Sequence, residues 1–143
     1  MIDIREIRIG DVLINTVDNV DCVVESIDRT MGIDSIYAVK DCELYVYPKE
    51  NYCKIPIAED LLLQLGFQKE VDEISRKEFY MYLPNGFRVD INKYSNTLGR
   101  DYGIHIDNLC SDSVLSGDIQ YLHQLQNYIY DSTKQELDIT NII

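Results

Sequence analysis

A helical pattern between Gly117 and Tyr130 is the feature that most limits how this chain can fold. At 100° per residue, one side of this helix carries apolar side chains, namely Ile119, Leu122, Leu125 and Ile129. The opposite side carries Gln120, Gln124, Asn127 and Asp131. An apolar stripe of this kind has to be buried against another layer. We therefore predict a helix near residues 118–131 that covers a sheet.

Three segments before this helix alternate between apolar and polar residues, as strands with one buried face do. They are residues 79–83, 87–91 and 103–107. The first two flank Pro84-Asn85-Gly86, and Asn-Gly is a strong hairpin signal. These segments predict an antiparallel sheet of three to four strands, covered by the long helix, in a lobe that spans residues 55–143.

The first 54 residues read as a separate lobe of short strands. Residues 20–27 are rich in β-branched side chains, and Leu44-Tyr45-Val46-Tyr47 ends at Pro48. Several short strands without helical periodicity predict a small curled sheet or an SH3-like β-barrel in residues 1–54, and we take the SH3-like β-barrel as the expected fold of this lobe. A short helix, residues 58–66, should follow, because Gly66 is suited to close it. The expected fold class is α+β.

Charge restricts the partners of the chain. Its formal net charge is -12, and residues 101–143 carry seven acidic side chains and the single base Lys134. Nonspecific nucleic-acid binding depends on basic side chains that neutralise phosphates, so we expect no direct nucleic-acid binding. The acidic surface would suit a protein partner with a basic surface.

Neither a membrane segment nor a cofactor motif is present in the sequence. No stretch approaches the ~20 apolar residues that span a bilayer, and the first residues lack a signal-peptide pattern. We therefore expect a cytoplasmic protein, whose cysteines are reduced. These are Cys22, Cys42, Cys53 and Cys110, and they form no C-x-x-C motif. We expect no cofactor and no metal.

The outward face of the predicted C-terminal sheet is the candidate site for a partner. If the apolar residues of the three strands point inward, a second set points outward together: Tyr80, Tyr82, Arg88, Asp90, His105 and Asp107. Tyrosine and arginine are enriched among the residues that dominate binding energy at interfaces. The alternative interpretation is an ordinary solvated sheet face with cross-strand ion pairs.

Catalysis has little support in the sequence, and we assign no catalytic residue. The only histidines are His105 and His123. Together with Asp107 and Cys110 they could in principle bind zinc, although nothing in their spacing requires it. The chain contains no Gly-rich phosphate loop, G-x-S-x-G or H-E-x-x-H motif.

Two further segments have distinctive patterns. Ile55–Phe67 has the form IPxxExLLxxLGF, and Tyr121–Asn127 has the form Y(V/L)HQLQN. Together they resemble a family of short proteins without established activity from gut bacteria of the Bacteroides group and their phages. The family continues with a Thr-Gly-Glu-Glu-Leu segment, whereas Ser132–Leu137 lacks the glycine here. The resemblance implies an accessory protein encoded by a phage or mobile element, and it transfers no functional residues.

The sequence thus favours a noncatalytic protein-binding accessory protein. One alternative is an acidic inhibitor of a host nucleic-acid-processing or defence complex, because an acidic surface can occupy a basic nucleic-acid channel. The second alternative is a small metal- or ligand-binding enzyme around His105 and His123.

Overall fold

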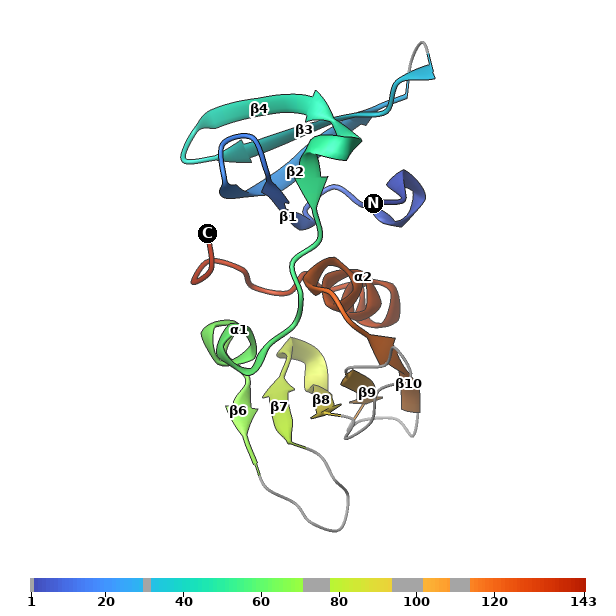
Figure 1. Cartoon of the computed structure of the whole chain (residues 1–143). Helices are drawn as coiled ribbons and strands as arrows, with labels where there is room; N and C mark the ends of the chain where they lie inside the picture. Colours follow the sequence, from blue (N-terminus) through green and yellow to red (C-terminus); the bar gives the residue numbers. More distant parts are fainter. Residues whose placement is uncertain (1, 30–31, 71–77, 94–101, 109–113) are drawn as a thin grey trace. The chain divides into compact units, whose positions relative to one another are not determined.

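A computed structural model describes residues 2–29, 32–70, 78–93, 102–108 and 114–143, and shows an α+β protein (Figure 1). The chain divides into two compact units. The first comprises Met1–Pro56, Tyr121–Asn127 and Ile143, and the second comprises Ile57–Gln120 and Tyr128–Ile142. Among the described residues, no helix is long and apolar enough to cross a membrane.

Unit 1 contains a curled antiparallel sheet, a half-barrel. Its strands are β1 (Val12–Asn15), β2 (Val20–Asp28), β3 (Ser35–Lys40), β4 (Glu43–Pro48) and β5 (Tyr52–Cys53). The spatial order is β4-β3-β2-β1-β5, so β5 returns to pair with β1. The 3-10 turns η1 (Ile4–Glu6) and η3 (Lys49–Asn51) precede β1 and β5. A bulge between Val24 and Ser26 bends β2.

The core of unit 1 lies on one face of this sheet. Its buried residues are Ile2, Ile4, Ile7, Leu13, Cys22, Val24, Ile36, Ala38 and Tyr52. Period-two alternation explains the set, because Cys22 and Val24 lie on one face of β2, as do Ile36 and Ala38 on β3. Burial raises the pKa of the Cys22 thiol to about 11, so Cys22 is a small protonated side chain of the core.

Unit 2 contains a second antiparallel sheet, with five strands where the sequence predicts three to four. They are β6 (Gln68–Lys69), β7 (Phe79–Tyr82), β8 (Phe87–Lys93), β9 (Tyr102–Asn108) and β10 (Val114–Ile119). The spatial order is β10-β9-β8-β7-β6. The Asn-Gly hairpin lies between β7 and β8, where the 3-10 turn η4 (Pro84–Gly86) reverses the chain.

The short helix α1 (Glu59–Gln64) precedes this sheet. It begins at Ala58, whose side chain makes no capping hydrogen bond. It ends at Gly66, which has a φ of 98°. The Phe67 amide donates to the Leu62 carbonyl at 3.0 Å, and the Gly66 amide donates to Leu63 at 3.1 Å. This pair of bonds is the Schellman motif, in which glycine is favoured because of its left-handed conformation.

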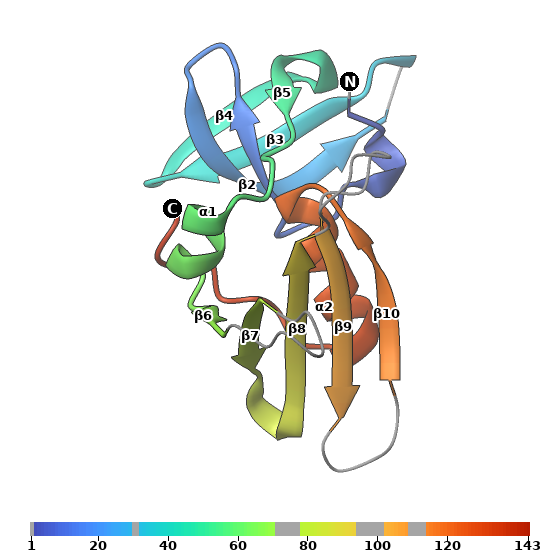
Figure 2. The ribbon, with the colours of Figure 1, turned by 60° about the horizontal axis from the view of Figure 1, so that its bottom comes forward.

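The long helix α2 (Leu122–Thr133) begins later than the sequence pattern predicts. The expectation of helix from residue 118 is wrong, because Val114–Ile119 form β10 and pair with β9. Short apolar segments fit the period of a helix as well as that of a strand, and hydrogen-bonded pairing with a neighbouring strand decides between the two. Gly117 of β10 is close to Tyr128 of α2, where an added Cβ would lie 2.7 Å from the ring. Figure 2 shows β8, β9 and β10 side by side in the sheet of unit 2.

The first half of α2 belongs to unit 1, where two amide side chains hold it. The Gln126 amide accepts from the Val12 backbone N–H and donates to the Gly10 carbonyl, both at 2.9 Å. Asn127 donates to the Glu6 carbonyl at 3.0 Å and accepts from the Arg8 side chain at 2.9 Å. Asn127 lies opposite the apolar stripe of the helix and satisfies polar groups of the segment before β1.

Candidate functional site: the tyrosine and arginine face of the second sheet

The strand register places all six candidate residues on one face of the unit 2 sheet. One cross-strand row contains Tyr80, Asp90 and His105, and the next contains Tyr82, Arg88 and Asp107. We call these six residues the Tyr-Arg face. The opposite face carries the buried apolar residues of the same strands, namely Phe79, Val89, Ile91, Ile104 and Ile106. The alternation in the sequence thus places the six residues on one face, but Asp90 is 1% exposed, so its expected position at the surface is wrong. The function of this face as a partner site stays a prediction.

Arg88 is the centre of the Tyr-Arg face. Its Nε donates to Asp90 Oδ1 at 2.9 Å, its Nη1 to the Tyr82 hydroxyl at 3.0 Å and its Nη2 to Glu70 Oε2 at 3.2 Å. The guanidinium also lies 4.7 Å from the ring centroid of Tyr80 and 5.4 Å from that of Tyr82. Only a planar fork of donors can make these contacts together, so lysine could not replace arginine here.

Opposing effects act on the charge of Arg88. Partial burial lowers the pKa of the guanidinium, whereas the hydrogen bond and the charge of Asp90 raise it, and the net shift is upward. Asp90 itself is 1% exposed. Arg88 therefore stays charged and serves as the counterion of a buried carboxylate.

The two tyrosines are held in fixed positions at the surface. Tyr82 is 56% exposed, and its ring meets that of Tyr80 edge to face, with 5.9 Å between the centroids. The Tyr80 hydroxyl donates to the Gln68 side chain at 2.7 Å. A tyrosine that is already ordered loses little conformational entropy when a partner binds, which favours binding.

Two members of this surface are missing from the sequence prediction. Gln68 of β6 bonds to Tyr80, and Glu70, the residue after the end of β6, bonds to Arg88. From the sequence alone, this segment reads only as a polar connection or a weak strand. The sequence could have indicated that Gln68 and Glu70 act together, because residues two apart point to the same face of a strand. Asp90 and Glu70 bond the Arg88 guanidinium, and Asp107 is the cross-strand partner of Arg88 on β9, so three acidic residues share this face with one arginine. The face is acidic as a whole.

The arrangement does not favour metal chemistry. Among the described residues, no group of three His, Cys, Asp or Glu side chains could hold a metal ion. His105 and Asp107 lie on β9 in unit 2, whereas His123 belongs to the part of α2 in unit 1. Cys110 lies outside the described residues.

His123 has a structural environment in unit 1. It is 1% exposed, and its ring stacks on Tyr121 with 6.0 Å between the centroids. The Lys54 ammonium lies 4.9 Å from the Tyr121 centroid, and Glu6 Oε2 lies 3.9 Å from His123 Nε2. Burial and the positive charge of Lys54 lower the pKa of His123 to about 4, against the weaker opposite effect of Glu6. The imidazole is therefore neutral at pH 7.

This shifted pKa predicts that acid destabilises the protein through His123. The pKa of His123 is about 4 in the folded state and 6.5 in the unfolded state. The free energy of unfolding is therefore at its full value above pH 6.5 and falls as the pH decreases toward 4, because the unfolded state binds a proton more readily. The loss across this range should be about 3 kcal/mol. Urea unfolding at several pH values measures it. His123→Leu should remove this pH dependence. Lys54→Met should narrow the pH range over which stability is lost, because the pKa of His123 then rises toward 6.5. If stability falls with pH in His123→Leu as it does in the wild type, this explanation is wrong.

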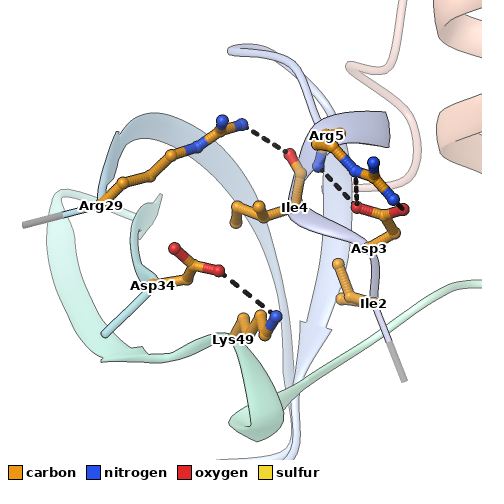
Figure 3. Close-up of a pocket in the computed structure, with 7 residues that line it drawn as sticks. All are labelled: Ile2, Asp3, Ile4, Arg5, Arg29, Asp34 and Lys49. Carbon is orange, nitrogen blue, oxygen red and sulfur yellow. Dashed lines mark hydrogen bonds and ion pairs between the residues drawn. The ribbon is translucent and has the colours of Figure 1, made fainter. Parts of the chain in front are cut away.

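A second surface feature is a shallow hollow in unit 1, shown in Figure 3. It measures about 560 Å³ and is lined by Ile2, Asp3, Ile4, Arg5, Arg29, Asp34 and Lys49. Each of its cations already has an acceptor inside the hollow. Arg5 bonds Asp3 at 2.7 Å, Lys49 lies 3.3 Å from Asp34, and Arg29 donates to the Ile4 carbonyl at 3.4 Å. The positive and negative charges in the hollow thus nearly cancel, and its cations are already bonded to acceptors of the protein, which does not favour the binding of an anion.

Comparison with known protein families, with curated proteins and with solved structures finds no match for this chain. The function therefore has to be inferred from the geometry and charge of the candidate site.

Proposed function

We propose that this protein is a noncatalytic accessory protein that binds a protein partner through the Tyr-Arg face. The observation that carries the proposal is the fixed contact of Arg88 with Tyr80 and Tyr82 beside a 56% exposed Tyr82 ring. Tyrosine and arginine dominate binding energies at interfaces, and preorganisation lowers the entropic cost of association.

The partner should have a basic contact surface. Glu70, Asp90 and Asp107 outnumber the single positive charge of Arg88 on this face, and the whole chain has a net charge of -12. Complementary charges accelerate the encounter and select the partner. Binding should therefore weaken as salt concentration rises, because salt screens attraction between exposed charges.

A nucleic-acid-processing or defence complex of the host is one specific class of partner with such a surface. In this version the protein is an acidic inhibitor that is encoded by a phage or mobile element, and it occupies the basic channel of that complex. The net charge favours it, because an acidic protein imitates the charge of the nucleic acid. Added nucleic acid should then compete with the protein for its partner. A small metal- or ligand-binding enzyme around His105 and His123 is not favoured by any observation above.

We also propose that the half-barrel of unit 1 is SH3-like. Strands β1 to β4 are consecutive neighbours, a 3-10 turn precedes β5, and β5 pairs with β1. These features support the proposal because an SH3-like barrel is a small, strongly bent sheet whose last strand returns to the first. An experimental structure of unit 1 compared with SH3 domains would test it.

Affinity capture from the host tests the proposed binding function. Wild-type protein should retain a host protein that Tyr82→Ala retains much less. Leu63→Ala is the matched control, because Leu63 is 45% exposed in the same unit and lies on α1, away from the face. Capture that is equally strong with Tyr82→Ala and with wild type would show that the partner binds elsewhere.

A further inference from the structure

Asp107 is the acidic residue of the Tyr-Arg face whose charge no nearby cation neutralises. In its cross-strand row it lies directly opposite Arg88, a position in which opposite charges usually attract each other. Within the part of the chain that the structure describes, however, the Asp107 side chain makes no hydrogen bond or ion pair. It is partly exposed, so its carboxylate is available to a partner.

The direction of the Arg88 side chain explains why Asp107 has no bonded cation. Arg88 Nε donates to Asp90 at 2.9 Å, and its Nη2 donates to Glu70 at 3.2 Å. Glu70 follows β6, which lies beyond β7 in the sheet, whereas Asp107 lies on β9 at the other side of β8. The guanidinium therefore extends over β7 and away from Asp107.

Tyr82 lies on the other side of Arg88 in the same cross-strand row. Its ring meets the Arg88 guanidinium at 5.4 Å from the centroid and the edge of the Tyr80 ring at 5.9 Å between centroids. Tyr82 is nevertheless 56% exposed, so these contacts leave much of the ring accessible. The contact with Arg88 also demonstrates that this ring accepts a guanidinium group.

We propose that one arginine side chain of a protein partner binds between Tyr82 and Asp107. Its guanidinium bonds to the Asp107 carboxylate and lies against the accessible part of the Tyr82 ring. The proposal rests on the proposed function, because it takes the Tyr-Arg face as the binding surface. It adds the chemical group by which a basic partner is recognised there, and it makes Asp107 a specificity-determining residue.

The spacing of the strands suits a single guanidinium between these two residues. Tyr82 on β7 and Asp107 on β9 are separated by two strand spacings, which together measure about 9.6 Å. A guanidinium that forms two hydrogen bonds with a carboxylate has its carbon about 4 Å from the carboxylate carbon. A cation that interacts with a tyrosine ring lies within about 6 Å of its centroid. One guanidinium can therefore contact both side chains.

Arginine suits this position better than lysine does. A guanidinium is planar, so it can bond a carboxylate with its edge while its flat face lies against a ring. An ammonium is a compact, strongly hydrated charge that cannot make both contacts in this way. Arg88 already combines carboxylate bonds with ring contacts on the same face. We expect an arginine ligand to bind about tenfold more tightly than its lysine analogue.

Titration of the isotope-labelled full chain, followed by NMR, tests the site with two blocked peptides, acetyl-Gly-Ser-Arg-Ser-Gly-amide and its lysine analogue. The arginine peptide should shift the signals of Asp107 and Tyr82 saturably. Asp107→Asn should weaken its binding about tenfold, the effect of losing a charged hydrogen-bond partner. Asp131→Asn, the matched control, removes an exposed carboxylate of α2 in the same unit and should leave binding unchanged. Because Asp107 makes no bond in the described structure, Asp107→Asn should unfold at the same urea concentration as the wild type.

Three results would overturn the arginine site. They are equal affinity for the arginine and lysine peptides, equal affinity of the wild type and Asp107→Asn, and the absence of a saturable shift at roughly 10 mM peptide. Failure of the proposed function is a different result, because it is measured by capture from the host. Capture that depends on Tyr82 but not on Asp107 would overturn the arginine site and leave the proposed function intact. Capture that does not depend on Tyr82 would contradict the proposed function, whatever the peptides show.

Discussion

Leu122→Asp should lower the free energy of unfolding by about 4 kcal/mol or more. Leu122 is fully buried at the start of α2, and a carboxylate at this position has no partner to compensate for lost hydration. Urea denaturation followed by circular dichroism measures the change. In a domain at the lower end of the usual stability range, about 5 kcal/mol, a loss of this size leaves a measurable unfolded fraction without denaturant.

Gln124→Ala is the control for this prediction, because Gln124 lies two residues away on the same helix. Its side-chain oxygen accepts from the Tyr121 amide at 3.1 Å, which is half of a capping box. Loss of that bond should cost only about 0.5 to 1 kcal/mol. If the two variants unfold at the same urea concentration, burial of the apolar side of α2 does not contribute substantially to the free energy of unfolding.

Arg88→Ala should destabilise the protein by about 2 to 4 kcal/mol. The substitution removes the guanidinium that bonds Asp90 at 2.9 Å, and it leaves that carboxylate, 1% exposed, without its counterion. Urea denaturation of Arg88→Ala and of the double variant Arg88→Ala, Asp90→Ala separates the two effects. The double variant should be more stable than the single one, because it no longer buries a carboxylate that has lost the Arg88 guanidinium.

Lys69→Ala provides a matched control at the surface of the same unit. Lys69 lies 2.8 Å from Glu59, and both side chains are about half exposed, at 49% and 51%. Exposed pairs of this kind contribute about 0 to 1 kcal/mol. Equal destabilisation by Arg88→Ala and Lys69→Ala would contradict the view that Arg88 and Asp90 form the structural centre of the Tyr-Arg face.

The strands of unit 2 were the most predictable part of the fold from local patterns. Period-two alternation and the Asn-Gly turn identified β7, β8 and β9, and the same alternation placed Tyr80, Arg88 and His105 on one face. Both signals are local, because each depends on residues that are close in the sequence.

Features that depend on distant residues were not predictable in this way. Ile119 belongs to β10 because it pairs with Tyr102, although its spacing from Leu122 also fits a helix. Gln126 is buried because its amide matches backbone groups of Gly10 and Val12, and helical periodicity carries no information about such a match. Gln68 and Glu70 lie beside Tyr80 and Arg88 because β6 pairs with β7, and this pairing could not be predicted from the local sequence.

The dissociation constant of the captured host partner tests the proposed function most directly. Titration calorimetry with the wild type, Tyr82→Ala and Leu63→Ala at two salt concentrations provides it. We expect Tyr82→Ala to weaken binding by roughly 30-fold or more, the effect of losing a dominant interface residue. Leu63→Ala should leave the constant unchanged, and higher salt should weaken binding of the wild type. Equal constants for wild type and Tyr82→Ala would contradict the assignment of the Tyr-Arg face as the binding surface.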